Sequence, residues 1–190
     1  MLGSSRASQR LLTETVDAAF HDQGLGAAGS DLLAVTDLLT REKTLRLALA
    51  DGGRPESERA AILSGLVGEQ ISPLALSLAT TAVSQRWSTD ADLVDALEMA
   101  GGSCIIGDAE KAGLADDVAD QLFQFGRVVD GNGELQLTLS DTAVPAESKR
   151  AIGAEVLADR ADPRAIELIS FVVTHLRGRR VEEAIDQMVD

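Results

Sequence analysis

The sequence predicts an all-α protein made of two tandem six-helix bundles, related by an internal duplication with an offset of 90 residues. The first observation is that residues 134–152 resemble residues 44–62. The second observation is that the four prolines of the chain form two pairs at this same offset, Pro55 with Pro145 and Pro73 with Pro163. Aromatic residues make up only 3% of the chain, so aliphatic side chains must fill the core, which favours packed helices over sheets.

The length of the repeat decides between two kinds of internal repetition. Solenoid proteins repeat units of roughly 20–50 residues, and a period of 90 is too long for them. We therefore interpret the pattern as two copies of one domain, with residues 1–100 as the first helical bundle and residues 101–190 as the second.

The first three helices of copy one follow from apolar spacing. An apolar stripe over residues 11–20 predicts the first helix, and Gly24 and Gly26 are expected to end it. The second helix is expected over residues 30–41 and a short third helix over residues 45–49. The third segment, LRLALAD, and its counterpart LQLTLSD also alternate like strands. We favour helix, because no second strand stands nearby to pair with either.

The last three helices of copy one are marked by their start signals. Pro55 falls in the first turn of the fourth helix, where proline is tolerated. Ser72 and Pro73 read as the N-cap and first position of a fifth helix that ends near Ser84. Leu, Val and Leu at helical spacing predict a sixth helix over residues 90–100.

Copy two repeats this order, with one weak element. Its second to sixth helices are predicted over residues 118–129, 135–139, 146–157, 164–176 and 181–188. The first helix should lie within GGSCIIGDAEKAG, which holds four glycines, and each glycine costs ~1 kcal/mol relative to alanine inside a helix. We therefore predict a hinge or frayed helix between the copies, with the bend at Gly101 and Gly102.

Charge and composition limit the partners. The formal net charge is −14, so the surface repels nucleic-acid phosphates and anionic lipid headgroups, and partners should be proteins with basic or apolar faces. The single cysteine, Cys104, cannot form an internal disulfide, which fits a reducing cytoplasm. The start MLGSSRASQR lacks the apolar stretch of a signal peptide, and no run approaches 18 apolar residues, so a soluble chain without membrane insertion is expected.

The histidines, the cysteine and the glycine-rich stretches do not form the motif of a catalytic, metal or phosphate-binding site. His21 and His175 lie in different copies and are expected to be solvated helix residues. Cys104 is expected to be a partly buried structural thiol. The glycine-rich stretches do not follow a strand and so do not resemble phosphate loops. We therefore expect no catalytic residues, no metal and no cofactor.

Two further features each leave two interpretations open. The basic cluster at residues 177–180 could cap the C-terminal carbonyls of the fifth helix of copy two or contact a partner. Trp87, the only tryptophan, could plug the space between helices or anchor an interface.

The order of these elements resembles a known family. The run LFQFGRVVDGNGELQLTLSDTAVPAESKRAI, followed by HLRGRRVEEAI, is similar to the N-terminal domain of the delta subunit of bacterial ATP synthase, the counterpart of the mitochondrial oligomycin-sensitivity subunit. In copy one, KTLRLALADGG and VSQRWSTDADLVDALE resemble the extended, duplicated delta subunits of actinobacteria.

The resemblance implies a stator protein of the proton-transporting ATP synthase rather than an enzyme. In the family this domain sits on the catalytic head and binds the N-terminal helices of alpha subunits, and a separate C-terminal domain holds subunit b of the peripheral stalk. That C-terminal domain has no counterpart in residues 1–190, so the chain is expected to be part of a longer protein. Its expected location is the cytoplasm, peripheral to the inner face of the plasma membrane.

By the same resemblance, an alpha-subunit helix would lie in a groove between the first and fifth helices of a bundle, over an apolar floor. The residues implied are Leu11, Leu12, Thr15, Val16, Leu74, Leu78, Ala79 and Ala82 in copy one, and Ile105, Ile106, Ile166, Ile169 and Val173 in copy two. The alternative is a generic α-helical adaptor of some other complex. The two interpretations differ in whether the native gene continues past Asp190 and lies among genes for ATP synthase subunits.

Overall fold

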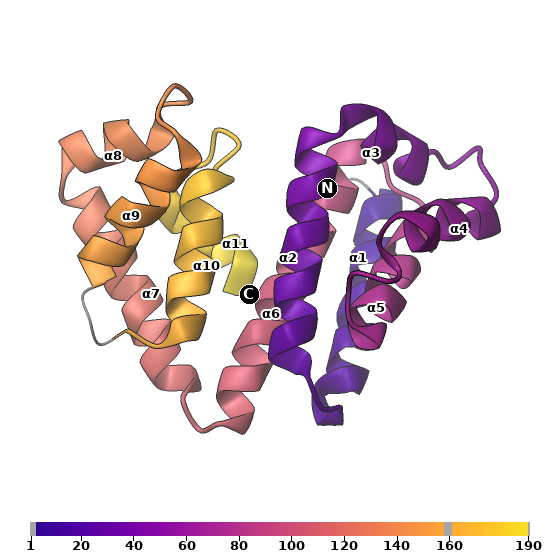
Figure 1. Cartoon of the computed structure of the whole chain (residues 1–190), viewed down its shortest axis with the longest axis horizontal. Helices are drawn as coiled ribbons and strands as arrows, with labels where there is room; N and C mark the ends of the chain where they lie inside the picture. The colour runs from indigo at the N-terminus through magenta and orange to yellow at the C-terminus, as the bar shows by residue number, and fades with distance from the viewer. Residues whose placement is uncertain (1–2, 158–160, 190) are drawn as a thin grey trace. The chain divides into compact units, whose positions relative to one another are not determined.

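The structure is a computed structural model, which describes residues 3–157 and 161–189. All regular secondary structure in these residues is helical, which confirms the predicted all-α class (Figure 1). The helices are α1 (Gly3–Ala18), the short 3-10 helix η1 (Ala19–His21), α2 (Leu25–Arg41), α3 (Lys43–Ala50), α4 (Glu56–Val67), α5 (Pro73–Ser84), α6 (Asp90–Lys111), α7 (Ala115–Asp130), α8 (Gly133–Ser140), α9 (Ala146–Leu157), α10 (Pro163–Thr174) and α11 (Val181–Val189).

The chain divides into two compact units, which meet within α6. Unit 1 is Met1–Ile105 and unit 2 is Ile106–Asp190. The bounds of α8, α9 and α10 equal those of α3, α4 and α5 with 90 added to each residue number. The segments with a strand-like alternation are the helices α3 and α8, so the helical interpretation of both is confirmed.

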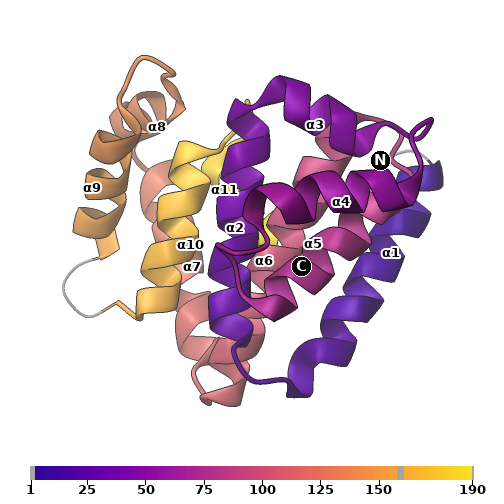
Figure 2. The ribbon, with the colours of Figure 1, turned by 45° about the vertical axis from the view of Figure 1, so that its right-hand side comes forward.

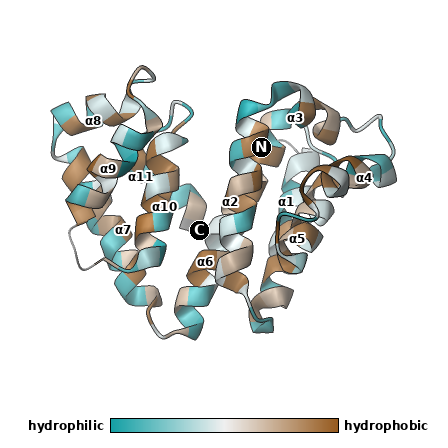
Figure 3. Cartoon of the chain, viewed as in Figure 1, coloured by the Kyte–Doolittle hydropathy of each residue, from teal (hydrophilic) through white to brown (hydrophobic). Residues whose placement is uncertain are grey.

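In unit 1, α2 packs against α3 and α5, and α5 packs against α1 and α4. Figures 1 and 2 show α1 and α5 side by side. Apolar and polar residues alternate around the helices (Figure 3), and the apolar ones meet in the core. Its largest fully buried side chains include Leu12, Leu32, Leu39, Leu78 and Leu97.

In unit 2, α10 packs against α7, α9 and α11, and α7 also packs against α8, α9 and α11. The buried residues of α7 are spaced three and four apart, at Val118, Leu122, Phe125 and Val129, which is the pattern of one helix face turned to the core. They lie opposite a similar apolar face on α10, which buries Leu168 and Ile169 among others.

The predicted helix caps are confirmed. Ser72 Oγ accepts a hydrogen bond from the N–H of Ala75 at 3.4 Å, and Pro73 occupies the first position of α5. Asp162 Oδ1 accepts from the N–H of Arg164 at 2.9 Å at the start of α10. Each cap residue also donates its own N–H to a side chain of the central helix of its unit, Ser72 to Asp31 Oδ2 at 2.7 Å and Asp162 to Gln121 Oε1 at 2.8 Å.

Two predictions about glycines are wrong. The expected bend at Gly101 and Gly102 is absent, because α6 continues without interruption from Asp90 to Lys111. Gly26 was expected to end the first helix, but it lies inside α2, which begins at Leu25. The turn before α2 needs only Gly24, whose φ of 83° is in the left-handed region that favours glycine.

Gly101 of α6 is explained by its packing against α2. A Cβ atom added to Gly101 would lie 2.8 Å from Leu33 Cδ2 and 3.2 Å from the carbonyl oxygen of Gly29. A Cβ atom added to Gly29 would lie 2.7 Å from the carbonyl oxygen of Gly101. The two helices therefore approach so closely that neither position accommodates a side chain, and tertiary packing outweighs the low helix propensity of glycine.

Candidate partner-binding surfaces

The seam between α1 and α5 is the predicted binding surface of unit 1. Two buried serines of α1 form hydrogen bonds to residues 86–92, which end the turn after α5 and begin α6. Ser5 Oγ donates to Asp92 Oδ2 at 2.7 Å and accepts from the N–H of Ser88 at 2.7 Å. Ser8 Oγ donates to the carbonyl oxygen of Arg86 at 2.7 Å. Because both serines are buried, these bonds hold α1 in a fixed position on the bundle.

Most of the residues named for this seam lie in the core of unit 1. The buried ones are Leu12, Val16, Leu78, Ala79 and Ala82. The accessible ones are Leu11, which is 41% exposed, and the half-buried Thr15 and Leu74. Thr15 Oγ1 donates to the carbonyl oxygen of Leu11 within α1 at 2.7 Å, so this hydroxyl already has an acceptor within its own helix.

The corresponding seam of unit 2 lies between the second half of α6 and α10. Ile106 on α6 and Ile166 on α10 are half-buried, while Ile169 and Val173 are in the core. Ile105 was predicted to line this seam, and it is instead buried in unit 1, where its Cγ1 lies 2.6 Å from the position of a Cβ atom on Gly29.

An ion pair crosses the seam of unit 2. Arg164 on α10 donates from Nε to Asp108 Oδ2 on α6 at 2.7 Å, and its Nη1 lies 3.2 Å from Asp162 Oδ2. The hydrogen bond to Asp108, together with that to Asp162, raises the pKa of the Arg164 guanidinium. The residue of unit 1 at the same place, 90 positions earlier, is Leu74. The seam of unit 1 is therefore more apolar than that of unit 2.

The two histidines and the cysteine occupy separate environments. His21 is exposed in η1, as predicted. The prediction for His175 is wrong, because this side chain is only 7% exposed. Its ring stacks on Phe171 with centroids 4.1 Å apart, and its Nδ1 lies 3.0 Å from the carbonyl oxygen of Phe171.

Cys104 is fully buried, and this burial raises the pKa of its thiol to about 11. The thiol was predicted to be partly buried, and it is instead fully buried.

Within residues 3–157 and 161–189, no three His, Cys, Asp or Glu side chains lie close enough together to hold a metal ion. No helix in this part of the chain is long and apolar enough to cross a lipid bilayer.

The structure gives Arg179 and Trp87 structural roles, one from each of the two open features. Arg179 caps the end of α10, because its Nη2 donates to the carbonyl oxygen of His175 at 2.9 Å and its Nε to that of Leu176 at 3.0 Å. Trp87 is buried in the core of unit 1, and its Nε1 donates to the carbonyl oxygen of Ala82 at 2.9 Å. The tryptophan therefore plugs the space beside α5.

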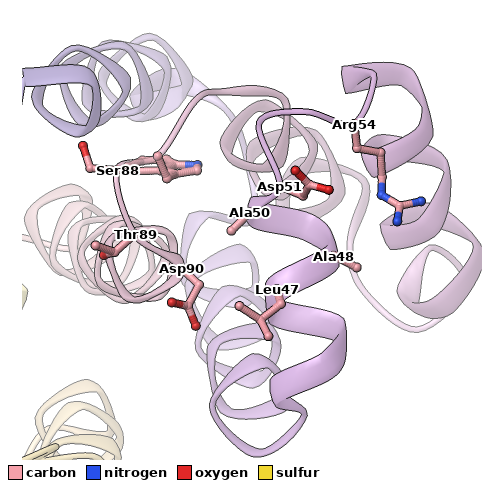
Figure 4. Close-up of a pocket in the computed structure, with 9 residues that line it drawn as sticks. Leu47, Ala48, Ala50, Asp51, Arg54, Ser88, Thr89 and Asp90 are labelled. Carbon is pink, nitrogen blue, oxygen red and sulfur yellow. The ribbon is translucent and has the colours of Figure 1, made fainter.

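A shallow hollow of about 730 Å³ lies between α3 and the turn that precedes α6 (Figure 4). Leu47, Asp51 and Arg54 line one side of it, and Ser88 and Asp90 line the other. The hollow brings together one arginine and two carboxylates with exposed apolar surface. It offers no paired acid and base, and no histidine or cysteine, for catalysis.

An exposed apolar surface on α7 was not predicted from the sequence. Phe123 is 60% exposed and Val128 is 48% exposed, whereas Phe125 is buried. The run LFQF contained the signal, because two phenylalanines two residues apart on a helix cannot both face the core.

The chain is similar in sequence to known proteins. A family model described as "ATP synthase delta (OSCP) subunit" matches residues 103–190. ATP synthase subunit delta of Salinispora arenicola is 36% identical over 190 residues, which cover 98% of this chain and 69% of the relative. The subunit delta of Nocardia farcinica is 36% identical over 192 residues, covering 100% and 71%. That of Streptomyces coelicolor is 34% identical over 190 residues, covering 99% and 69%.

The described residues form an all-helical protein built of packed amphipathic helices. The extent of the similarity to these relatives then identifies the family: the chain belongs to the ATP synthase delta (OSCP) subunit family. Members of this family are non-catalytic subunits of the peripheral stalk, so the chain is not an enzyme.

Proposed function

We propose that the chain is a stator subunit of a proton-transporting ATP synthase, which binds N-terminal helices of alpha subunits and links the catalytic head to subunit b of the peripheral stalk. The observation that carries this proposal is the similarity to subunits named ATP synthase subunit delta along nearly the whole chain. This similarity also favours the stator over the generic adaptor. In its working position the protein is peripheral to the inner face of the plasma membrane.

The proposal includes an internal duplication, with one delta-type bundle in residues 1–100 and a second in residues 101–190. The matching bounds of three helix pairs at an offset of 90 support it. The paired bonds from Ser72 to Asp31 and from Asp162 to Gln121 support it further, because the four positions are related by the same offset while the residue types differ. In this arrangement α6 ends the first bundle and also begins the second.

An alpha-subunit helix would lie along the seam of α1 and α5, or along the corresponding seam of unit 2. Leu11, Thr15 and Leu74 offer the accessible surface in unit 1, and Ile106 and Ile166 offer it in unit 2. The buried residues beneath them support the seam without touching the ligand. Because the chain carries a net charge of −14, a helix with basic residues beside its apolar stripe would be attracted to it.

The stator role is tested by the coupling of ATP hydrolysis to proton transport. Membranes from the source cell are stripped of the native protein that contains this chain, and ATP hydrolysis and ATP-driven proton pumping are measured before and after that protein is added back. A stator keeps the head from turning with the rotor, so its loss should abolish pumping while hydrolysis persists, and its return should restore pumping. Full pumping by the stripped membranes would refute the stator role.

A further inference from the structure

The outer face of α7 exposes a large aromatic side chain. Phe123 is 60% exposed and Val128 is 48% exposed. We define the outer face of α7 by the residues that line a shallow hollow of about 450 Å³ on this helix: Asp120, Phe123, Gln124, Arg127 and Val128. A phenylalanine ring as exposed as this one gains free energy when it is removed from water, so the face suits a covering segment.

The corresponding face of α2 is covered in unit 1 by the chain itself. At the offset of 90, Phe123 corresponds to Leu33 and Ala119 to Gly29. Leu33 is only 3% exposed and Gly29 is buried, whereas Phe123 and Ala119 are exposed. The cover is α6, because a Cβ atom added to Gly29 would lie 2.6 Å from Ile105 Cγ1 and 3.1 Å from the backbone nitrogen of the same residue.

In unit 2 the helix α11 takes the place of α6. Its buried residues have the same spacing as four buried residues near the start of α6: Val181, Ala184, Ile185 and Met188 on α11, and Leu93, Ala96, Leu97 and Ala100 on α6. α11 packs against α7, and Ile185 Cδ1 lies 3.9 Å from the position of a Cβ atom on Gly126. By this spacing the counterpart of Ile105, which covers Gly29 in unit 1, falls past Asp190.

We infer that α11 continues past Asp190 in the native protein, and that about two further turns of this helix pack on the outer face of α7 and bury Phe123. This is the arrangement by which α6 covers Leu33 in unit 1. The inference rests on the proposed duplication and not on the stator role. The relatives extend beyond the aligned region, because 190 aligned residues make up 69% of the Salinispora arenicola subunit. That extra length is enough for two helical turns, which take roughly seven residues.

The contacts in unit 1 also give the direction of the continuation. Gly101 lies against Leu33, and Ile105, one turn later on α6, lies against Gly29, one turn earlier on α2. The two helices are therefore antiparallel, and the continuation of α11 should run toward the N-terminus of α7. Exposed aspartates at residues 116, 117 and 120 lie there. We expect Lys or Arg near the end of the continuation, because these carboxylates and the carbonyl end of its own helix both attract a positive charge.

Thiol modification tests whether Phe123 is covered. Phe123→Cys and the control Leu137→Cys are made separately in the native protein and in the chain that ends at Asp190. Leu137 is 75% exposed on α8 of the same unit. Each protein is treated with a maleimide, and the rate at each site is read by mass spectrometry of the peptide that contains it, so that other thiols do not contribute.

In the native protein, Phe123→Cys should react roughly tenfold or more slowly than Leu137→Cys, because the continuation blocks access to the thiol. In the chain that ends at Asp190, the two sites should react at similar rates, because both positions are exposed there. Similar rates in the native protein would overturn the inference. Equal protection of Phe123→Cys in both proteins would also overturn it, because the cover would then lie within residues 1–190.

Crosslinking identifies the covering segment. Gln124→Cys places a thiol on the outer face of α7, and a thiol-reactive benzophenone is attached to it in the purified native protein. Cys104 stays unmodified, because it is fully buried and its thiol pKa is raised to about 11. A crosslink within the first four helical turns after Asp190 is expected. A crosslink only elsewhere in the chain, only to a second copy or to nothing would contradict the inference. Because the isolated protein is used, the inference and the stator role, which is tested in membranes, can fail separately.

Discussion

Gly29 on α2 and Gly101 on α6 face each other across a helix contact that leaves no room for a side chain on either residue. A Cβ atom added to Gly29 would lie 2.7 Å from the carbonyl oxygen of Gly101, and one added to Gly101 would lie 3.2 Å from that of Gly29. These residues connect an N-terminal helix of unit 1 to the helix within which the units meet. The contact therefore fixes how closely α2 and α6 pack within unit 1.

Replacing Gly29 by alanine should destabilise the protein. The new methyl group would meet backbone as well as Ile105, and forcing helices apart in a packed core costs roughly 1–3 kcal/mol. Gly101→Ala should cost less, because its closest obstacle is the flexible end of the Leu33 side chain. Urea denaturation followed by circular dichroism measures both changes in the free energy of unfolding.

Gly65→Ala is the control for helix propensity. Gly65 lies inside α4, and nothing is within 4 Å of the position of its added Cβ atom. Alanine should therefore stabilise this helix by roughly 0.5–1 kcal/mol. If Gly29→Ala stabilised the protein as Gly65→Ala does, the close helix contact would be refuted.

The helix starts of α5 and α10 could be predicted from the sequence, whereas the course of α6 at its glycines could not. Local signals sufficed for α5 and α10, because Ser72, Asp162 and the following prolines specify helix starts through contacts within a few residues. They failed at Gly101 and Gly102, where low helix propensity predicted a bend. The packing of α6 on α2 involves residues more than 70 positions apart, from Gly29 to Gly101, and no local pattern records it.

The cap of α10 should contribute measurably to stability. Asp162→Ala removes the acceptor for the N–H of Arg164 at 2.9 Å, and the loss of an N-cap costs roughly 0.5–2 kcal/mol. Ser72→Ala should cost less, because the bond from the Ala75 N–H is longer, at 3.4 Å. Thermal unfolding of both variants compares them, and Asp162→Asn, which keeps a side-chain acceptor, should restore most of the loss. A larger effect at Ser72 than at Asp162 would contradict this order.

Acid should weaken the protein partly through Asp90. The hydrogen bond from Arg46 Nε to Asp90 Oδ2 at 2.7 Å lowers the pKa of this carboxyl in the folded state below its ordinary value. A carboxyl with a lowered folded-state pKa stabilises the fold above its unfolded-state pKa, near 4, and the stabilisation disappears as the pH falls through the folded-state pKa. Asp90→Asn should therefore lower stability at pH 7 and flatten its decline below about pH 5.

Asp116→Asn provides the comparison for this pH experiment. Asp116 also lies in the first turn of its helix, so both substitutions remove one negative charge from a helix N-terminus. Urea midpoints measured between pH 3 and pH 7 should decline less steeply for Asp90→Asn than for Asp116→Asn. Identical pH slopes for the two variants would show that the Arg46 ion pair does not stabilise the fold.

Cys104 should react slowly in the folded protein. Burial raises its thiol pKa from 9.0 to about 11, so the thiolate fraction at pH 8 falls roughly a hundredfold. Ellman's reagent should therefore modify the native protein at least that much more slowly than the protein in denaturant, because burial also hinders access. Rapid, stoichiometric modification under native conditions would show that α6 opens at this residue.

The candidate site was less predictable from sequence than the fold. The resemblance indicated which helices form the seam, but apolar spacing cannot separate residues that face the core from residues that face a ligand. Leu11 and Leu12 are adjacent and identical, yet only Leu12 is buried. His175 was missed for a related reason: its stacking on Phe171 depends on the turn that follows α10, and the sequence pattern there is that of an exposed helix end.

The central proposal is that a seam of the helical units holds an alpha-subunit helix. A labelled peptide from the N-terminus of the alpha subunit of the same ATP synthase is titrated with the parent chain and with variants at accessible seam positions. Leu74→Asp and Ile166→Asp place a charge in the seams of units 1 and 2, and Leu66→Asp, at a 49% exposed leucine of α4, is the control. Circular dichroism checks that each variant is folded.

We expect saturable binding by the parent, with a dissociation constant below about 100 micromolar. Whichever seam holds the helix, its variant should bind roughly tenfold or more weakly, because a buried aliphatic contact is replaced by a desolvated charge. Leu66→Asp should bind like the parent. Absence of saturable binding by the parent, or parental affinity in both folded seam variants, would contradict the proposal that these seams bind alpha.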